Sequence, residues 1–231
     1  MDVPWGVKRQ LDIPRSGAGL GADGIPRCWW CLGDETYLRY HDAEWGRPSA
    51  DDRQLFEKLV LEGFQSGLSW LIILRKRDNF RKAFKDFDPE IVARFNSRSV
   101  ERLLRDAGIV RHRGKIESTI NNARRYLDLR DEFGSLATYA WSYEPDDRGR
   151  HASLDWPTLV ELGAAPEAVA MSKDLRRRGW TFVGPTTAYS FMEACGLVND
   201  HVTACSVREE ADAERKRFAR PEVMHPGGAQ V

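Results

Sequence analysis

The sequence predicts an all-α protein that folds as one compact helical bundle. Three observations lead to this prediction. Apolar residues recur at helical spacing in several segments, most of these segments begin with a capping residue or a proline, and alternating strand patterns are scarce. With 231 residues, of which 42% are hydrophobic, the chain has enough apolar material for a core without disulfides.

The first predicted helices lie in the amino-terminal half. Aspartates at 51 and 52 stand where a helix N-cap belongs, and the apolar residues that follow at helical spacing predict a helix from about 51 to 66. An apolar run from Trp70 to Leu74 predicts a second helix that continues into basic residues. Asp88 followed by Pro89 is a cap with proline at the first helical position, and it predicts a third helix over 91–95.

A pair of helices is predicted between about 100 and 129. The apolar pattern of the first begins at Val100, and Gly108 is expected to follow it in a left-handed conformation. Lys115 begins the pattern of the second helix, so a short turn joins the two. Three further helices are predicted over 155–162, 166–178 and 185–195, and the last of these is closed by Gly196.

The two ends of the chain differ in composition from this body. Residues 1–26 combine Gly, Pro, Arg and Asp with little periodicity, and residues 207–231 are mostly polar and charged. We expect both to be disordered tails around one domain over residues 27–206. The first 26 residues contain no apolar run like that of a secretory signal, and no stretch is long enough to span a bilayer. We therefore expect a cytoplasmic protein without a membrane partner.

The charge balance leaves nucleic-acid binding to local clusters. The 35 basic and 35 acidic residues cancel, so the chain has no net field that attracts DNA. The turn over 108–115 has small residues that free backbone amides and basic side chains beside a helix N-terminus, which together suit a phosphate. Such a turn grips the DNA backbone without reading bases, although an ordinary αα-hairpin with a solvated basic turn explains it equally well. The residues expected to contact DNA are Gly108, Val110, Arg111, Arg113, Gly114 and Lys115.

Cysteines and histidines at both ends of the body suggest a metal site. His201 and Cys205 stand four residues apart, on one face if they belong to a helix, and Cys28 with either Cys31 or His41 can complete four ligands. Spacing alone favours Cys31, because a two-residue gap is the usual zinc knuckle. A closed four-ligand site would be structural and would join the two ends of the chain. Scattered buried thiols and a core histidine are the alternative.

Four long segments resemble the DNA-3-methyladenine glycosylase I family. They are Tyr37 to Gly46, Leu61 to Trp70, Asp106 to Ile116 and Phe182 to His201, so the resemblance covers about residues 27–206. In that family the two-helix turn is a helix-hairpin-helix DNA clamp. The resemblance also implies one structural zinc ion per chain, with Cys31 as a spare thiol and with Cys28, His41, His201 and Cys205 as the ligands.

The implied activity is that of a base-excision repair glycosylase. It hydrolyses the N-glycosidic bond of 3-methyladenine in alkylated double-stranded DNA, releases the base and leaves an abasic site. We expect a monomer that associates with a bacterial nucleoid when it acts, and a monofunctional enzyme, because no lysine is assigned as a nucleophile. The implied base pocket holds Glu62 in the catalytic position, together with Tyr40, Trp70, Trp30 and the neighbouring Tyr37.

The chemistry of these residues supports that assignment. An alkylated adenine is cationic, so aromatic faces attract it, and a buried carboxylate can pair with its exocyclic amine. We assign Glu62 to recognition and electrostatic help, and no residue is assigned as a general base. The alternatives are a solvated carboxylate at Glu62 and core packing for the aromatic residues. Phe64 stands where we expect a smaller or polar residue, which leaves the selectivity among alkylated bases open.

Two other classes of function remain open from the sequence. A non-catalytic zinc and DNA-binding module would keep the clamp and bind lesion or abasic DNA without releasing a base. A zinc hydrolase would use the metal as a Lewis acid and would need an open coordination position with only three protein ligands.

Overall fold

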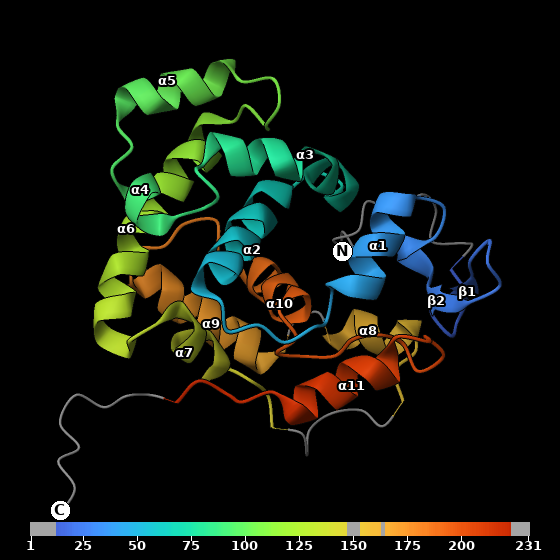
Figure 1. The fold of residues 1–231 in the computed structure, drawn as a ribbon. Helices are drawn as coiled ribbons and strands as arrows, with labels where there is room; N and C mark the ends of the chain where they lie inside the picture. Colours follow the sequence, from blue (N-terminus) through green and yellow to red (C-terminus); the bar gives the residue numbers. More distant parts are fainter. Residues whose placement is uncertain (1–12, 147–152, 163–164, 223–231) are drawn as a thin grey trace, which may run out of the picture.

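The structure is a computed structural model that describes residues 13–146, 153–162 and 165–222. These residues form a helical body with one small antiparallel sheet, in which Ala18 pairs with Cys28 (Figure 1). None of the described helices is long and apolar enough to cross a membrane. The elements are β1 (Ala18–Leu20), β2 (Pro26–Cys28), the short 3-10 helix η1 (Trp29–Cys31), α1 (Glu35–Ala43), α2 (Asp52–Gln65), α3 (Trp70–Ala83), α4 (Pro89–Ala93), α5 (Ser97–Arg105), α6 (Arg113–Phe133), α7 (Leu136–Trp141), α8 (Trp156–Leu162), α9 (Pro166–Arg177), α10 (Pro185–Ala194) and α11 (Arg208–Arg217).

Helix α2 lies at the centre of the body. It contacts α3, α6, α7 and α10, and ten of its consecutive residues, from Leu55 to Phe64, are buried (Figure 1). Asp51 starts the helix by accepting a hydrogen bond from the backbone N–H of Gln54 at 2.9 Å. A helix buried on all sides carries its polar residues into the interior as well, which is how Lys58 and Glu62 come to lie inside the protein.

The predicted all-α class and the predicted helices are confirmed. Helix α2 matches the segment predicted over 51–66, and α8, α9 and α10 begin within one residue of their predicted starts. Asp88 caps α4 by accepting from two backbone N–H groups, with Pro89 at the first turn. Helix α3 begins at Trp70 as expected and extends to Ala83, beyond the basic run.

The prediction of a left-handed Gly108 is wrong. Helix α5 ends at Arg105, and the glycines with positive φ do not include Gly108. Its N–H instead donates to Oδ1 of Asp106 at 2.8 Å, so an aspartate side chain forms the turn after the helix. The glycine is needed for close packing, because a Cβ atom there would lie 3.0 Å from Asn79.

The structure also differs from the disorder expected before residue 27. Strands β1 and β2 form a hairpin in residues 18–28. Its side chains are held by Arg27, which is 7% exposed and pairs with Asp23 and Asp42, each at 2.9 Å. These ion pairs give order to a segment whose composition alone predicts none, while residues 1–12 lie outside the described residues.

The expected carboxyl-terminal tail likewise contains helix α11. Arg47 pairs with Glu210 at 2.9 Å and with Glu214 at 2.8 Å, and Arg215 pairs with Glu144 at 2.7 Å. The helix is therefore fixed by partners about 70 to 170 residues away in sequence. Long-range charge pairs of this kind leave no periodic pattern, and the rest of the expected tail, from residue 223, lies outside the described residues.

Candidate functional site

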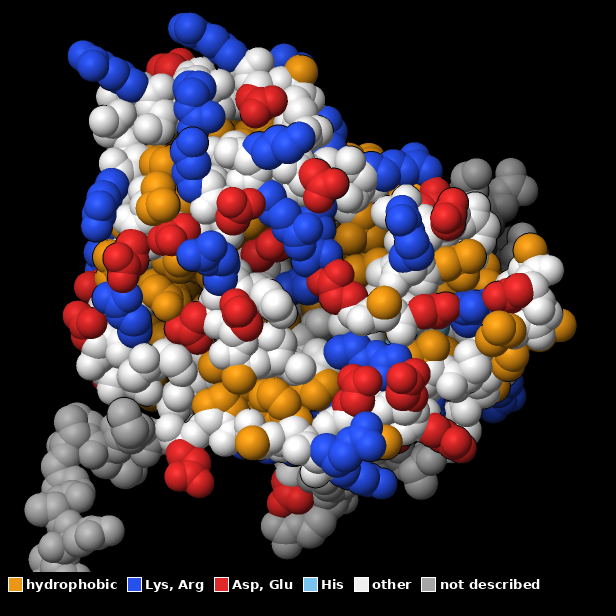
Figure 2. Space-filling model, viewed as in Figure 1, with side chains coloured by type: hydrophobic (Ala, Val, Ile, Leu, Met, Phe, Trp, Pro, Cys, Tyr) orange, Lys and Arg blue, Asp and Glu red, His pale blue; other side chains and the backbone are white. Residues whose placement is uncertain are grey.

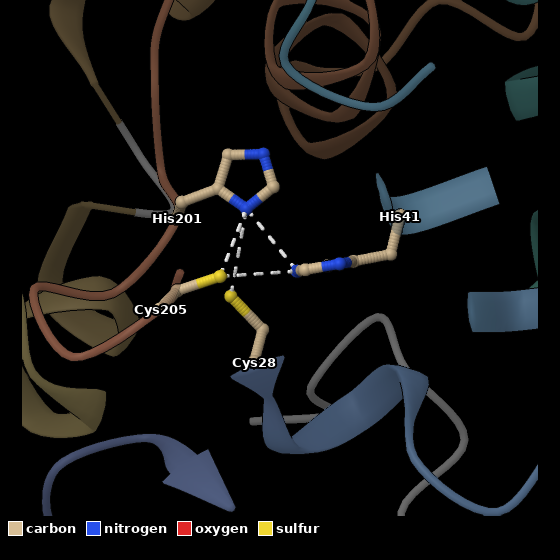
Figure 3. Close-up of side chains that lie close together, drawn as sticks. All are labelled: Cys28, His41, His201 and Cys205. Atoms are coloured by element: carbon tan, nitrogen blue, oxygen red, sulfur yellow. Dashed lines mark hydrogen bonds between the residues drawn. The ribbon is translucent and has the colours of Figure 1, made fainter. Parts of the chain in front are cut away.

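Four side chains from opposite ends of the chain form a buried cluster, shown in Figure 3. Their ligand atoms all lie within 4.8 Å of one another. Nδ1 of His201 is 3.1 Å from Nε2 of His41, 3.5 Å from Sγ of Cys205 and 3.9 Å from Sγ of Cys28. Tetrahedral zinc with ordinary bond lengths separates its ligand atoms by about 3.3 to 3.8 Å. The cluster therefore has the donor set and the size that could hold one such ion.

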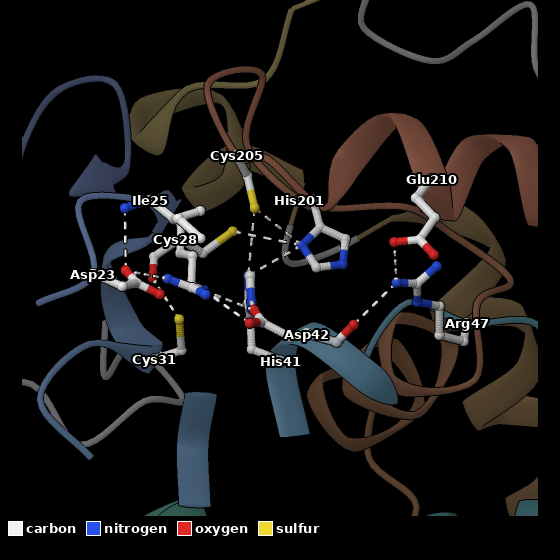
Figure 4. Close-up of polar contacts among 11 residues, drawn as sticks. Asp23, Ile25, Cys28, Cys31, His41, Asp42, Arg47, His201, Cys205 and Glu210 are labelled. Atoms are coloured by element: carbon white, nitrogen blue, oxygen red, sulfur yellow. Dashed lines mark hydrogen bonds and ion pairs between the residues drawn. The ribbon is translucent and has the colours of Figure 1, made fainter. Parts of the chain in front are cut away.

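Each histidine of the cluster is oriented by a second hydrogen bond. Nδ1 of His41 lies 2.7 Å from Oδ1 of Asp42 (Figure 4). Nε2 of His201 lies 3.1 Å from the carbonyl oxygen of Trp45. If each of these contacts takes the N–H of its ring, the unprotonated nitrogens, Nε2 of His41 and Nδ1 of His201, direct their lone pairs toward the centre of the cluster. Gly46 leaves room for this arrangement, because a Cβ atom there would lie 3.1 Å from the His201 ring.

The cluster contains the four residues implied by the family resemblance, and Cys31 is outside it. The Cys31 thiol donates to the backbone carbonyl of Cys28 at 3.0 Å. The knuckle favoured by spacing is therefore wrong for this structure. His201 and Cys205 also do not share a helix, because residues 201–205 form a turn in which the N–H of Cys205 donates to Val202.

The expected base-pocket residues come together from four elements. Tyr37 and Tyr40 lie on α1, Glu62 on α2 and Trp70 at the start of α3, and Trp30 belongs to η1. The ring centroids of Tyr40 and Trp70 are 5.6 Å apart, as are those of Trp30 and Tyr37. The Tyr37 hydroxyl accepts from the backbone N–H of Leu71 at 3.0 Å and so holds α1 against α3. Tyr37 and Tyr40 also interact electrostatically with Glu62, so the acid lies near these aromatic pairs.

Glu62 is a buried carboxyl group with little compensation. It is 6% exposed, and the described residues form no hydrogen bond with its carboxylate. Burial raises the pKa of Glu62 to about 8, while the nearby Lys58 ammonium opposes the shift. Nε1 of Trp70, which is 2% exposed, also has no hydrogen-bond partner among the described residues. An unpaired buried acceptor and an unpaired buried donor in one group are features that a polar ligand can satisfy.

The predicted DNA-binding turn lies between α5 and α6, on a surface with many basic side chains. Figure 2 shows Lys and Arg side chains gathered over α5 and α3. Arg111 is exposed, and Arg113 is exposed but pairs with Glu101 at 2.6 Å. Gly108, Val110 and Gly114 are half-buried.

Lys115 does not belong to this exposed set. It is 8% exposed, and its ammonium donates to the backbone carbonyls of Phe64 at 2.8 Å and Ser66 at 2.5 Å. These carbonyls lie at the end of α2, where helix geometry leaves them without intrahelical partners. In this structure the Lys115 side chain caps α2, so its ammonium is already engaged by these carbonyls.

Two residues near the site were missed by the sequence analysis. Phe182 is 39% exposed with a φ of 55°, and its ring lies 6.3 Å from that of His112, the N-cap of α6. Lys58 lies one turn before Glu62 and contacts Tyr40. The signal for Lys58 was a charged residue on the apolar face of a helix, whereas positive φ at a phenylalanine has no sequence signal.

Comparison with known proteins fits this arrangement. A family model of methyladenine glycosylases matches residues 30–209. DNA-3-methyladenine glycosylase 1 of Escherichia coli K12 is 47% identical over 182 residues, which cover 78% of this chain and 96% of that protein. The chain therefore belongs to the methyladenine glycosylase family.

Solved structures give the same result. A crystal structure of 3-methyladenine DNA glycosylase I matches with 45% identity and a TM-score of 0.71, covering 78% of this chain and 98% of the other. A tyrosine-to-phenylalanine variant of 3-methyladenine DNA glycosylase I, solved in complex with 3-methyladenine, matches with 36% identity and a TM-score of 0.69. That match covers 79% of this chain and 97% of the other.

Proposed function

We propose that this protein is a monofunctional DNA glycosylase that releases 3-methyladenine from alkylated double-stranded DNA and leaves an abasic site. The observation that carries the proposal is the buried Glu62 carboxyl, which has no hydrogen-bond partner among the described residues and lies near Tyr37 and Tyr40, in a member of the methyladenine glycosylase family. The enzyme acts as a monomer in base-excision repair.

The pocket suits a cationic purine. Tyr40 and Trp70 provide aromatic faces, which attract an electron-poor base beyond ordinary stacking. Glu62 accepts a hydrogen bond from the exocyclic amine of the flipped base and, when ionised, balances its positive charge. Trp30 and Tyr37 complete the wall next to these residues. The alkyl group has already made the base a good leaving group, so recognition and charge stabilisation supply most of what the enzyme must add.

The two-helix turn between α5 and α6 holds the DNA backbone. Arg111 supplies an exposed charge, and the backbone amides between Gly108 and Gly114 supply donors near the N-terminus of α6. These contacts do not read sequence, so they give a salt-dependent affinity for duplex DNA. Lys115 contributes by fixing α6 to the end of α2.

Cys28, His41, His201 and Cys205 hold one zinc ion with a structural role. Support comes from the buried donor set and from the histidine orientation by Asp42 and Trp45. Four protein ligands fill a tetrahedral site, which favours a structural ion over the hydrolase that needs an open position. When bound, the ion supplies a crosslink between the two ends of the chain and no chemistry in the pocket.

The assignment without a lysine nucleophile is supported by Lys58 and Lys115, the two buried lysines among the described residues. The ammonium of Lys58 is paired with Glu44, and that of Lys115 with two carbonyls. A Schiff base needs a free amine, so we assign water as the nucleophile and expect no strand cleavage.

The first experiment measures release of 3-methyladenine from methylated duplex DNA, with the base products separated. Wild type should release the base, Glu62→Gln should lose most of this activity, and both should bind DNA that contains an abasic site. Glu161→Gln, which changes an exposed carboxylate on α8, is the matched control and should behave as wild type. Binding without release by a folded, zinc-loaded wild type would contradict the proposal and would favour a DNA-binding module.

A further inference from the structure

Lys58 is a buried cation placed against a pocket residue. It is 5% exposed, and burial of an ammonium is costly unless acceptors surround it. Its Nζ donates to the hydroxyl oxygen of Tyr40 at 3.3 Å and lies 4.3 Å from the centroid of that ring. Its other partner is Glu44, with which it forms an ion pair. Lys58 therefore links the pocket tyrosine to a buried charge cluster.

The charge cluster does not need Lys58 to compensate Glu44. Arg77 donates two hydrogen bonds to the Glu44 carboxylate, at 2.6 and 2.7 Å, in the bidentate geometry that arginine favours. Arg77 also pairs with Glu57, which in turn pairs with Arg81. Glu44 thus keeps a strong partner when Lys58 is replaced, and the specific contact made by Lys58 is the one with Tyr40.

That contact decides the direction of the hydrogen bond made by Tyr40. An ammonium group has three donors and no acceptor, so the Tyr40 oxygen must accept from Lys58. The phenolic hydrogen of Tyr40 then needs a different acceptor, and no hydrogen bond among the described residues uses it. Tyr40 lies beside Trp70 and interacts electrostatically with Glu62. Its hydrogen is therefore available to a base in the pocket.

We propose that Lys58 is a positioning residue that fixes the Tyr40 hydroxyl as a hydrogen-bond donor to the damaged base. The inference rests on the proposed function, which assigns Tyr40 to the base pocket. With its oxygen already accepting from Lys58, Tyr40 is a poorer acceptor for a donor of the base than a donor to an acceptor of the base. The pocket then distinguishes bases that present an acceptor opposite Tyr40 from bases that present a donor.

Lys58 also has a second, electrostatic effect that the test must separate. Its charge favours the ionised form of Glu62. The other titratable groups that face Glu62 are Tyr37 and Tyr40 from α1, and Glu193 and Cys195 at the end of α10. Lys58 itself faces Glu44, Arg77 and Cys195. An effect through Glu62 would persist without the Tyr40 hydroxyl, whereas an effect through Tyr40 would not.

The experiment is a double-mutant cycle of Lys58→Met and Tyr40→Phe. For each variant we measure kcat and KM for 3-methyladenine release and the Kd of free 3-methyladenine from tryptophan fluorescence. Loss of one hydrogen bond predicts a Kd about 3- to 10-fold weaker for Lys58→Met in the wild-type background. In the Tyr40→Phe background the same substitution should change Kd by less than about 2-fold, within the scatter of independent sites. Lys58→Arg keeps a donor and should restore binding.

Other outcomes would overturn the inference. If Lys58→Met weakened the binding of 3-methyladenine equally in the wild-type and Tyr40→Phe backgrounds, Lys58 would not act through the Tyr40 hydroxyl. If this loss of affinity disappeared in a Glu62→Gln background, Lys58 would act through the charge on Glu62. A loss of affinity that parallels a fall in melting temperature and zinc content would show that Lys58→Met acts by disturbing the fold. If Lys58→Met does not fold, Lys58→Leu, which also lacks a donor, replaces it in the same cycle. If wild type releases no base, the proposed function fails, while Kd of the free base still decides the role of Lys58.

Discussion

The ammonium of Lys115 donates to the backbone carbonyl oxygen of Phe64 at 2.8 Å. This bond ties the first turn of α6 to the end of α2, which stops at Gln65. Phe64 follows Glu62 by two positions in the same helix. The element that follows the DNA-binding turn is thereby attached to the element that carries the pocket acid. A displacement of α6 on binding DNA would therefore pull on the end of α2 through this hydrogen bond.

Substitution of Lys115 should affect stability more than DNA contact. Lys115→Met leaves the buried carbonyl of Phe64 and that of Ser66 without this partner, so we expect the free energy of unfolding to fall by about 1–3 kcal/mol in urea denaturation. The salt dependence of binding to duplex DNA should remain that of wild type. Arg111→Ala should do the reverse, with normal stability and a salt slope reduced by about one. A reduced slope for Lys115→Met would mean that this lysine contacts a phosphate.

Removal of the metal should unfold the region that joins the two ends of the chain. We expect one zinc ion per chain by elemental analysis, and a lower melting temperature after treatment with a chelator, because metal binding is linked to folding. His201→Ala should abolish zinc binding. Cys31→Ala is the control, since this thiol lies outside the cluster, and loss of zinc from that variant would restore the knuckle hypothesis.

The ionisation of Glu62 should make stability depend on pH. The pKa of Glu62 is about 8 in the folded protein against an ordinary value of 4.5, so the folded state keeps the proton to a higher pH than the unfolded state does. Stability is therefore lost as pH rises from about 4.5 to 8 and stays low above that range. Glu62→Gln lacks this penalty and should be more stable than wild type by on the order of 3–5 kcal/mol at pH 9. Equal unfolding curves of the two proteins at pH 9 would show that Glu62 has an ordinary pKa.

The same ionisation should favour the cationic substrate at high pH. Because only the ionised Glu62 balances the positive charge of the alkylated base, KM for its release should fall as pH rises through about 8. The change should be absent in Glu62→Gln. A KM that is independent of pH in wild type would indicate that recognition does not need the charge.

Phe182 should contribute to DNA binding at some cost in backbone strain. Thr181 is fixed through hydrogen bonds with Asn122 at 2.9 and 3.0 Å, and this loop holds Phe182 at a φ of 55°. Phe182→Gly relieves the left-handed strain, so stability should be kept or should rise by about 1 kcal/mol. Affinity for duplex DNA should fall, because the exposed ring beside His112 is lost. Unchanged affinity in an electrophoretic shift assay would exclude this contact.

The sequence predicted the interior helices because each has a local start signal and an apolar pattern. It did not predict α1, although Asp34 caps that helix by accepting from Thr36 and Tyr37. The inward face of α1 consists of Tyr37, Tyr40 and His41, and these polar-tipped residues do not read as an apolar stripe. The residues expected to be functional therefore replaced the apolar pattern by which α1 could have been predicted.

The site shows a similar limit. The resemblance supplied His41, whereas spacing alone gave Cys31, because the chain passes through η1 and α1 between the two ligands Cys28 and His41. The buried lysines had no signal either, since Lys115 is buried only when the end of α2 supplies carbonyl oxygens. Partners that are brought together by packing cannot be recognised from local sequence.

The wide separation of the cluster residues bears on synthesis of the protein. Cys28 and His201 are 173 positions apart in the chain, and Cys205 follows still later. A chain that emerges from the ribosome with its amino-terminal end first cannot assemble the four-ligand cluster until nearly all of its helices have been made. A product shortened before residue 201 would lack half of the ligands. Only a chain that extends past Cys205 can therefore complete the four-ligand cluster.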